Sequence, residues 1–307
     1  MDISVVIPLY NKKDTIERAL RSVFAQTYQP KEIIVVNDGS TDGSEKIVKK
    51  IDHPKVRLIN QENRGVSAAR NRGIETAKCE WIAFLDADDE WDDGYLECMY
   101  TLKEKFPECS ILATAYYLKY SETDKQKIKL QRLPFKNNNG IISNYFEVAC
   151  HSHPPVWSSA VCVRKELLTE IGGFPVGIIS GEDLLTWAYL ALRSPVAYSV
   201  KPMAIFWQDS HSQIPTRIPD PKDTVGKKLI KLQKSVPPEH TKYFKRYISH
   251  WYKMRSNIYL RLGERNALNE IFKGLRFHLI NYKLHIFFLI YFLPHPLRLK
   301  VFKFLSA

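Results

Sequence analysis

The sequence predicts an α/β fold, with a mostly parallel sheet flanked by helices and a helical, basic C-terminal extension. Three observations predict it. Short β-branched runs alternate with helical stretches through the first half of the chain, which is the pattern of βαβ units. The strand-like runs are almost continuously apolar, which indicates helices on both faces of the sheet. After the proline-rich segment 214–223 the sequence becomes long, basic and aromatic.

The apolar periodicity predicts the individual elements. In segment 14–26 the apolar residues Ile16, Ala19, Leu20 and Val23 follow the spacing of one helical face. The segment KNNNG at 136–140 is predicted to be a loop. Strands are expected at 3–7, 32–36, 56–59, 81–85, 111–118 and 195–200, and further helices near 141–149, 165–171 and 182–193.

Length and composition favour a globular protein with two parts. The 307 residues are 45% hydrophobic and 25% charged, which is ordinary for a folded protein with a sizeable core. We expect a first domain over 1–218, divided into halves 1–110 and 111–218, and a helical region over 219–307. The five cysteines form no CxxC pair, so neither a disulfide framework nor a zinc site is expected, and a cytoplasmic location fits. The N-terminus lacks the features of a signal peptide.

The positive charge is concentrated at the C-terminal end. Residues 226–307 hold 17 Lys and Arg against 3 Asp and Glu, a net charge of +14, whereas residues 1–225 hold 28 against 30, a net charge of −2. Such asymmetry points to a polyanionic partner, either nucleic acid or an anionic membrane surface.

The apolar segment 277–294 bears on that choice. Its longest uncharged stretch, 286–293, is far shorter than the roughly 20 residues that span a bilayer. Aromatic and leucine side chains near Lys and Arg suit a helix at the headgroup boundary. A helix packed on the main domain is the alternative, and a true span is a third. We expect region 226–307 to contact an anionic membrane surface peripherally, on the inner face of the membrane.

A carboxylate cluster follows one predicted strand directly. Asp86, Asp88 and Asp89 in FLDADDEW come at the end of strand 81–85. Clustered carboxylates repel one another, so a compensating cation is expected, and hard oxygen ligands favour Mg²⁺ or Mn²⁺. The crevice beyond the carboxyl ends of parallel strands is also where ligands bind in open α/β sheets. The alternative is a turn whose aspartates cap a helix.

Other strand ends carry matching polar motifs. The stretches IPLYN, VVNDGSTDGS and NRGVSAARNRG precede FLDADD within the first 90 residues. In this order and spacing they resemble the donor half of family 2 glycosyltransferases, which have the GT-A fold. The sequence has neither GxGxxG after a strand nor GxxxxGK[ST], which disfavours dinucleotide dehydrogenases and P-loop phosphotransferases.

The resemblance implies roles in binding a nucleotide-sugar donor. Pro8 and Tyr10 would line the nucleoside pocket, Asp38 would hydrogen-bond the base, most often uracil, and Asn63 and Arg70 would complete the donor site.

The carboxylates Asp86 and Asp88 match the DxD motif of the family, whose aspartates hold the donor ribose and the metal bound to the diphosphate. Such a metal neutralises charge as the leaving group departs. His211 resembles a family histidine near the metal or diphosphate, although a plain surface residue is the alternative reading.

A second acidic motif is predicted on the acceptor side. Glu182 and Asp183 begin a helix, where they could simply stabilise its N-terminus. GGFP at 172–175 followed by GED at 181–183 resembles the acceptor motif of the family, which implies Asp183 as catalytic base and Glu182 as its orienting neighbour. One base opposite the leaving diphosphate implies inversion at the anomeric carbon. Trp157 is expected either to touch the acceptor or to be a core aromatic.

The resulting prediction is an inverting, metal-dependent glycosyltransferase. It would move a sugar from a nucleotide diphosphate, with UDP the expected nucleotide, to a hydroxyl of a saccharide or lipid-linked saccharide in cell-surface polysaccharide synthesis. One rival is a sugar-nucleotide nucleotidyltransferase, which should carry a glycine-rich phosphate loop after the first strand. Another is a non-enzymatic polyanion-binding protein, but no RNP-like or zinc-finger pattern supports a nucleic-acid partner.

Overall fold

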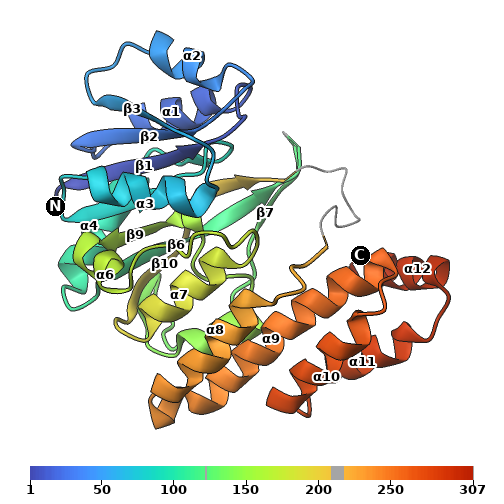
Figure 1. Cartoon of the computed structure of the whole chain (residues 1–307). Helices are drawn as coiled ribbons and strands as arrows, with labels where there is room; N and C mark the ends of the chain where they lie inside the picture. Colours follow the sequence, from blue (N-terminus) through green and yellow to red (C-terminus); the bar gives the residue numbers. More distant parts are fainter. Residues whose placement is uncertain (122, 209–217, 307) are drawn as a thin grey trace. The chain divides into compact units, whose positions relative to one another are not determined.

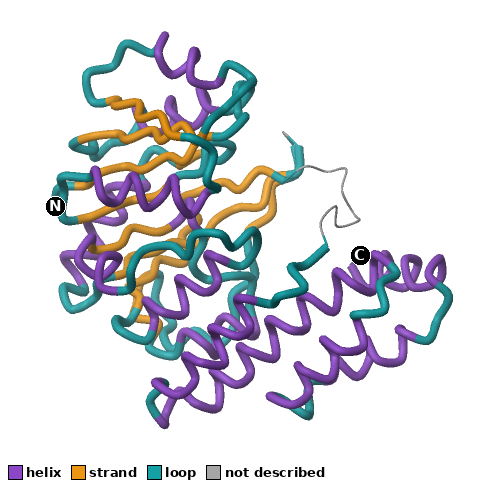
Figure 2. Tube along the Cα trace, in the orientation of Figure 1, coloured by secondary structure: helices purple, strands orange, loops and turns teal. Residues whose placement is uncertain are grey.

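The computed structural model describes residues 1–121, 123–208 and 218–306 (Figures 1 and 2). The chain divides into two compact units, Met1–Gln208 and Asp209–Ala307, and each is described here by itself. The boundary predicted from the sequence, after residue 218, follows a segment (209–217) that lies outside the described residues.

The first unit is built on one mixed sheet. Its N-terminal part is formed by four strands that the sequence predicted, β1 (Ile3–Leu9), β2 (Glu32–Asp38), β3 (Val56–Gln61) and β4 (Trp81–Phe84). They are parallel, and the structure orders them β3-β2-β1-β4 in the sheet. All seven residues of β1 are buried. Each fully buried Val, Leu or Ile side chain contributes about 1.5–3 kcal/mol relative to an exposed one, which explains the central place of this strand.

The sheet continues through the second half of the unit with mixed strand directions. β9 (Val161–Arg164) runs antiparallel to both β4 and β6 (Ile111–Lys119), and β10 (Val196–Trp207) runs parallel to β6. Three short strands complete the edges: β5 (Glu90–Trp91) and β8 (Asn139–Ile142) pair with β10, and β7 (Lys125–Lys127) pairs with β6.

Helices cover both faces of the sheet, as the apolar strands predicted. Figure 1 shows α3 (Val66–Thr76) in front of the sheet and α1 (Ile16–Phe24) behind it. The approach of α3 to β1 is close, because a Cβ built on Gly73 would lie 2.2 Å from a methyl of Val6. The remaining helices of this unit are α2 (Ser44–Lys50), α4 (Tyr95–Lys105), α5 (Tyr145–His151), α6 (Lys165–Glu170) and α7 (Glu182–Ala191).

One local prediction was wrong. Strand β8 takes the last two residues of the loop predicted at 136–140 and the first two of the helix predicted from 141, and the helix begins only at Tyr145. Ile141 and Ile142 pair antiparallel with Ala197 and Val196 of β10. Tertiary pairing of two β-branched residues with a neighbouring strand thus decides the structure here, over the local helical pattern.

The second unit is helical. Its helices are α8 (Thr224–Leu232), α9 (Pro238–Leu262), α10 (Ala267–Phe277), α11 (Tyr282–Tyr291) and α12 (His295–Ser306). Their apolar core includes Leu260, Ile271, Leu284, Phe287 and Ile290. Within the described residues, none of the helices combines the length and the apolar character that crossing a bilayer would need.

A buried ionic cluster lies within this second unit. Arg255 donates to Glu270 over 2.5 Å and lies 3.7 Å from Asp223, and all three side chains are buried. The carboxylate of Asp223 also accepts from the indole nitrogen of Trp251 over 2.9 Å. Such a cluster is stable only when every charge has partners, and here each of the three has.

Candidate active site

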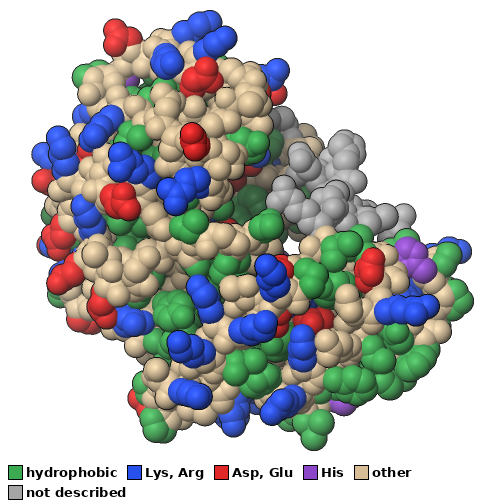
Figure 3. Space-filling model, in the orientation of Figure 1, with side chains coloured by type: hydrophobic (Ala, Val, Ile, Leu, Met, Phe, Trp, Pro, Cys, Tyr) green, Lys and Arg blue, Asp and Glu red, His purple; other side chains and the backbone are tan. Residues whose placement is uncertain are grey.

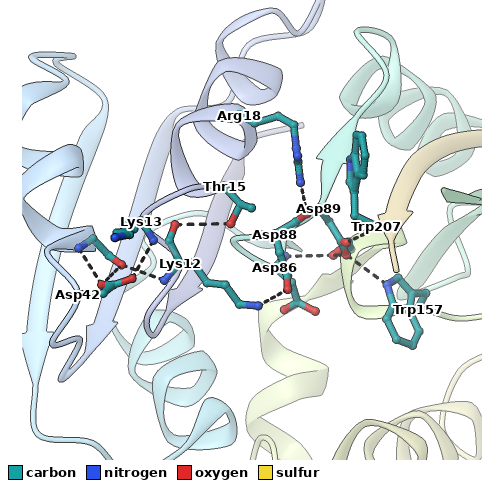
Figure 4. A network of polar contacts seen from close by, with 12 residues as sticks. Lys12, Lys13, Thr15, Arg18, Asp42, Asp86, Asp88, Asp89, Trp157 and Trp207 are labelled. Atoms are coloured by element: carbon teal, nitrogen blue, oxygen red, sulfur yellow. Dashed lines mark hydrogen bonds and ion pairs between the residues drawn. The ribbon is translucent and has the colours of Figure 1, made fainter. Parts of the chain in front are cut away.

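The candidate site begins where the loops after β1 and β2 meet at the carboxyl edge of the parallel strands. The backbone amide of Lys12 donates to the hydroxyl of Ser44 over 2.9 Å, and that of Lys13 donates to the carboxylate of Asp42 over 3.0 Å (Figure 4). Although its burial acts the other way, the hydrogen bonds that the Asp42 carboxylate accepts from Ser44 and from the amide of Lys13 lower the pKa of this carboxyl. The NDGSTDGS motif therefore fixes the loop that carries Lys12.

That loop places a cation on the carboxylate cluster. The ammonium of Lys12 donates to Asp88 over 2.5 Å, and the guanidinium of Arg18 donates to the backbone oxygen of Asp88 over 2.6 Å. Both side chains of the Lys12–Asp88 pair remain partly exposed, at 42% and 34%. Neither cation was predicted from the sequence. The signal that could have identified Lys12 is its position directly after IPLYN, in the loop that follows the first strand.

Asp89 has a different environment from Asp88. Its carboxylate is buried and accepts hydrogen bonds from the hydroxyl of Ser159 over 2.5 Å, the indole of Trp157 over 3.4 Å and the backbone amide of Trp207 over 3.3 Å. Burial, together with the nearby Asp86 and Asp88, raises the pKa of Asp89 well above its usual value. Asp89 therefore ties the carboxylate loop to β10 and to the turn before β9. 

Trp157 is half-buried between protein groups. Its ring packs against Phe206 at 4.4 Å and Tyr116 at 5.9 Å between ring centres, and its indole faces Asp89. Because the side chain is packed against these groups and is still partly exposed, both predicted readings, a core aromatic and an acceptor contact, stay predictions.

Arg70 connects the predicted donor and acceptor residues. The side chain is only 3% exposed, donates to Asp86 over 2.7 Å and lies 3.8 Å from a carboxylate oxygen of Glu182. Its Nε and Nη1 atoms are buried without a hydrogen-bond partner among the described residues. The guanidinium also lies over the ring of Phe174, at 5.1 Å from the ring centre. Two motifs that are far apart in sequence thus meet at one cation.

The GGFP motif is fixed beside Arg70. The side-chain amide of Asn71, the next residue of α3, donates to the backbone oxygen of Phe174 over 2.8 Å and accepts from its amide over 2.7 Å. Gly173 has φ +72°, and a Cβ there would lie 2.5 Å from the Asn71 side chain. A glycine is required at this position both by its backbone conformation and by the close approach of Asn71.

Glu182 and Asp183 form the first turn of α7. Gly181, in the left-handed conformation at φ +83°, precedes them, and Asp183 accepts a hydrogen bond from the amide of Leu184 over 2.6 Å. Burial and the neighbouring Asp183 raise the pKa of Glu182 to about 7, although Arg70 acts against them. Burial also raises the pKa of Asp183, against that hydrogen bond and Arg70. Carboxylates with raised pKa values are stronger bases, as general base catalysis requires.

Asp38 is engaged by the protein itself. One carboxylate oxygen accepts from Gln61 over 2.7 Å and from the amide of Arg64 over 3.0 Å, and the other accepts from the amide of Gly65 over 2.8 Å. Asp38 therefore holds the loop that opens α3. A carboxylate has about four lone-pair sites, so Asp38 can accept a further hydrogen bond. Its predicted hydrogen bond to the nucleobase of the donor stays a prediction.

The other predicted donor residues occupy the same edge. Pro8 is buried near the end of β1, and Tyr10, just beyond it, is 48% exposed. Asn63 is exposed, and its backbone nitrogen lies 3.0 Å from the position of a Cβ on Gly39, in the neighbouring loop. His211 lies outside the described residues.

The carboxylates fit a metal only together with further ligands. Across residues 1–121, 123–208 and 218–306 no group of three His, Cys, Asp or Glu residues could hold a metal ion. Asp86 and Asp88 are partly exposed, and each can provide one carboxylate. Mg²⁺ in proteins is commonly held by one or two carboxylates together with waters and substrate phosphates. The residues therefore fit a metal whose coordination the diphosphate of a donor would complete.

The fold and this carboxylate edge define the class of GT-A type transferases, in agreement with the fold class predicted from the sequence. The chain belongs to glycosyl transferase family 2, whose family model matches residues 4–168. This membership disfavours the nucleotidyltransferase and the non-enzymatic alternatives.

Two curated relatives are similar over the N-terminal part. The uncharacterised glycosyltransferase YibD of Escherichia coli is 47% identical over 102 residues, which cover 33% of this chain and 30% of YibD. The glycosyltransferase GlyA of Streptococcus pneumoniae is 38% identical over 125 residues, which cover 40% of this chain and 18% of GlyA. The match therefore spans less than a third of the length of either relative.

Solved structures share the fold over most of the chain. S. aureus TarS 1-349 superposes with a TM-score of 0.68 at 18% identity, covering 94% of this chain and 83% of that one. The same protein in complex with UDP-GlcNAc superposes with a TM-score of 0.62 at 17% identity, covering 91% and 89%.

Proposed function

We propose that the chain transfers a sugar from a UDP-sugar to an acceptor hydroxyl with inversion at the anomeric carbon. The observation that carries the proposal is Arg70, which pairs with Asp86 of the predicted donor motif and with Glu182 beside the predicted base. A base and a donor-binding carboxylate must lie close together for in-line transfer. The fold shared with TarS, which has been crystallised with UDP-GlcNAc, supports a nucleotide-sugar donor.

On the donor side, Asp86 and Asp88 would act at the diphosphate end of the donor. Asp88 would hold a Mg²⁺ or Mn²⁺ ion, and Asp86, fixed by Arg70, would accept a hydrogen bond from the ribose. The ion, when bound, supplies charge neutralisation for the departing diphosphate. Lys12 already contacts Asp88 and is the protein's own cation at this position.

On the acceptor side, Asp183 would take the proton of the acceptor hydroxyl. The acceptor oxygen then bonds to the anomeric carbon as the bond from that carbon to the diphosphate oxygen breaks, and UDP leaves. Attack from the face opposite the leaving group inverts the configuration. Glu182, held by Arg70, would orient the base from the same turn of α7.

A donor panel is the first experiment. UDP-sugars and other nucleotide sugars are added with and without Mn²⁺, and the thermal unfolding midpoint is recorded, because a ligand that binds only the folded state raises it. We expect the largest stabilisation with one UDP-sugar and Mn²⁺ together. Stabilisation by a nucleoside triphosphate alone, with release of pyrophosphate, would instead favour nucleotidyl transfer.

Two substitutions then separate binding from transfer. Asp183→Asn should keep the donor-induced stabilisation and lose transfer, whereas Asp88→Ala should lose the metal-dependent part of the stabilisation. Asp52→Asn, at an exposed position of the same unit, is the matched control. Undiminished turnover of the Asp183→Asn enzyme would remove the assigned base.

We further propose a saccharide or lipid-linked saccharide as acceptor and a peripheral position on the inner face of the membrane. The support is the charge of region 226–307, in which 17 Lys and Arg stand against 3 Asp and Glu. A basic surface attracts anionic lipid, which would bring the chain to an acceptor at the membrane. Incorporation of radiolabelled sugar into the organic or the aqueous phase of membrane extracts distinguishes the two acceptor types.

A further inference from the structure

The helical unit carries two concave surfaces on either side of Phe277, which we call the basic hollows. The first has a volume of about 600 Å³ and is formed by residues from α8, α9 and α10 together with the segment before α8. The second, of about 380 Å³, is formed by α9 and the end of α10. Cations line both of them: Lys222, Lys227, Lys273 and Arg276 the first, and Lys242, Lys245 and Arg246 the second.

Most of these cations have no carboxylate partner in the part of the chain that the structure describes. Lys273 is the exception, because it pairs with Glu270 at 2.8 Å. The one acidic residue lining the hollows, Asp223, is buried and occupied by Trp251, the amide of Gly226 and Arg255. Like charges gathered without counter-charge repel one another, so the hollows favour an external anion.

The turn beside the hollows is apolar and exposed. Leu279 and Ile280 are 72% and 75% exposed, and Tyr282 at the start of α11 is 66% exposed. The turn is held in place, because Asn281 donates to Ser249 of α9 over 3.0 Å. Several large apolar side chains that lie next to one another and remain exposed to solvent indicate an interaction surface.

Charge and apolar surface therefore lie side by side on this unit. Ile280 itself lines the second hollow. Figure 3 shows Lys and Arg side chains gathered over α8 to α10 and hydrophobic side chains gathered over α11. An anionic lipid surface has both complementary features, since it presents phosphates above an apolar interior, whereas a soluble phosphate compound offers only the charge.

We propose that the basic hollows bind the phosphates of anionic phospholipids while Leu279, Ile280 and Tyr282 enter the headgroup boundary. This inference deepens the proposed peripheral membrane association by naming the surface that docks. Stable attachment takes two signals, and this unit carries both: the cations of the hollows and the exposed apolar side chains of the adjoining turn.

The test is sedimentation of the full chain with vesicles. Phosphatidylcholine vesicles are compared with vesicles that also contain phosphatidylserine, at about 0.15 M and about 1 M salt. We expect binding to the anionic vesicles only, and weaker binding at the higher salt. Equal binding to both vesicle types, or no binding to either, would overturn the proposal.

Matched charge reversals locate the surface. Lys227→Glu with Arg276→Glu changes two cations of the first hollow, and Lys231→Glu with Lys234→Glu changes two exposed cations of the same unit outside both hollows. Each basic residue near an anionic leaflet contributes about fivefold in affinity, so the hollow variant should lose about 25-fold or more and the control much less. Equal losses in the two variants would show that only overall charge matters, and would overturn the assignment.

A second pair of changes tests the apolar turn. Leu279→Ser with Ile280→Ser should abolish vesicle binding while the unfolding midpoint stays within the range of the wild type, because both side chains are already exposed. Inorganic phosphate is added separately. If millimolar phosphate stabilises the chain and displaces it from vesicles, the hollows are a site for soluble anions. A dimer that the serine variant dissociates would show that the turn pairs two copies, and either result overturns lipid docking.

Donor turnover is measured without vesicles in every variant. UDP release by hydrolysis of the stabilising UDP-sugar, with water as the acceptor of the sugar, should be unchanged in the hollow and turn variants, since none of these residues lies in the proposed catalytic site. Vesicle binding therefore tests the docking surface alone when UDP release is intact. UDP release by the Asp183→Asn enzyme tests the catalytic proposal alone.

Discussion

Two buried arginines, one in each unit, make the same kind of contact with different consequences. Arg70 and Arg255 are each 3% exposed and each lie between two carboxylates. The partners of Arg70, Asp86 and Glu182, keep 21% and 13% of their side chains exposed. The partners of Arg255 are closed off, at 4% and 5%.

The exposure of the carboxylates distinguishes the two clusters: the cluster around Arg70 has the features of a binding site, and the cluster around Arg255 those of a structural element. Around Arg255 the carboxylates are also bound by Trp251 and Lys273, and the guanidinium donates to the backbone oxygen of Asp220. Around Arg70 two guanidinium nitrogens have no hydrogen-bond partner among the described residues. A closed ionic cluster has its interactions within the protein, whereas an open one can still bind a ligand.

The largest effect is expected from removing Arg70. Arg70→Met should lower the rate of UDP release by about 10²-fold or more, because Asp86 and Glu182 lose the group that positions them and small displacements at a reacting centre are costly. Turnover of purified enzyme, normalised to the folded fraction, is the measurement. A loss of turnover below about threefold would contradict the positioning role.

Removing Arg255 should affect stability instead. Arg255→Met should lower the free energy of unfolding by about 3–5 kcal/mol, because Glu270 and Asp223 are left buried without their cation. Urea unfolding measures it, with Arg246→Met as the control, since Arg246 has no carboxylate partner in the described part of the chain. UDP release per folded molecule should be unchanged. A loss of turnover without a loss of stability would contradict the structural role of Arg255.

The raised pKa of Glu182 predicts the pH dependence of stability in the free enzyme. Burial and Asp183 raise its pKa to about 7, so the folded state favours the protonated carboxyl. The stabilising contribution is therefore complete below the unfolded pKa of about 4.3 and is lost as the pH rises through about 7. We expect the wild type to lose about 2 kcal/mol from this group between pH 5 and pH 8, measured by urea unfolding.

Glu182→Gln is the matched control for this pH effect, because the amide has a similar shape and does not titrate. Its stability should lose that part of the pH dependence, and it should exceed the wild type most at pH 8. Identical pH profiles of the two proteins would show that Glu182 ionises normally.

The smallest effect is expected at Lys12. Its ammonium would compete with the proposed metal ion for Asp88, and because the pair is partly exposed its contribution is about 1 kcal/mol or less. Lys12→Met should lower the Mn²⁺ concentration for half-maximal donor stabilisation by up to about fivefold. Lys13→Met, at the adjacent residue, is the control. A higher Mn²⁺ requirement would mean that Lys12 contacts the donor diphosphate itself.

Local patterns predicted much of the fold. Apolar periodicity predicted six strands of the first unit (β1, β2, β3, β4, β6 and β10) and the helix starting at Glu182, but it did not predict β5, β7, β8 or β9. The placement of β8 could not be predicted, because Ile141 and Ile142 adopt a strand only by pairing with β10. The role of Asp89 was also hidden, since its partners Ser159 and Trp207 belong to other strands and turns.

The sequence by itself determined which residues are candidates for the chemistry: the carboxylates after β4, the acidic turn of α7 and the excess of cations after residue 225. Only the tertiary structure decided how they combine. The pairing of Lys12 with Asp88, 76 residues away, and of Arg70 with both Asp86 and Glu182 depends on where the sheet places its loops. Periodicity and motif spacing report on near neighbours in the chain, whereas ion pairs and burial depend on neighbours in space.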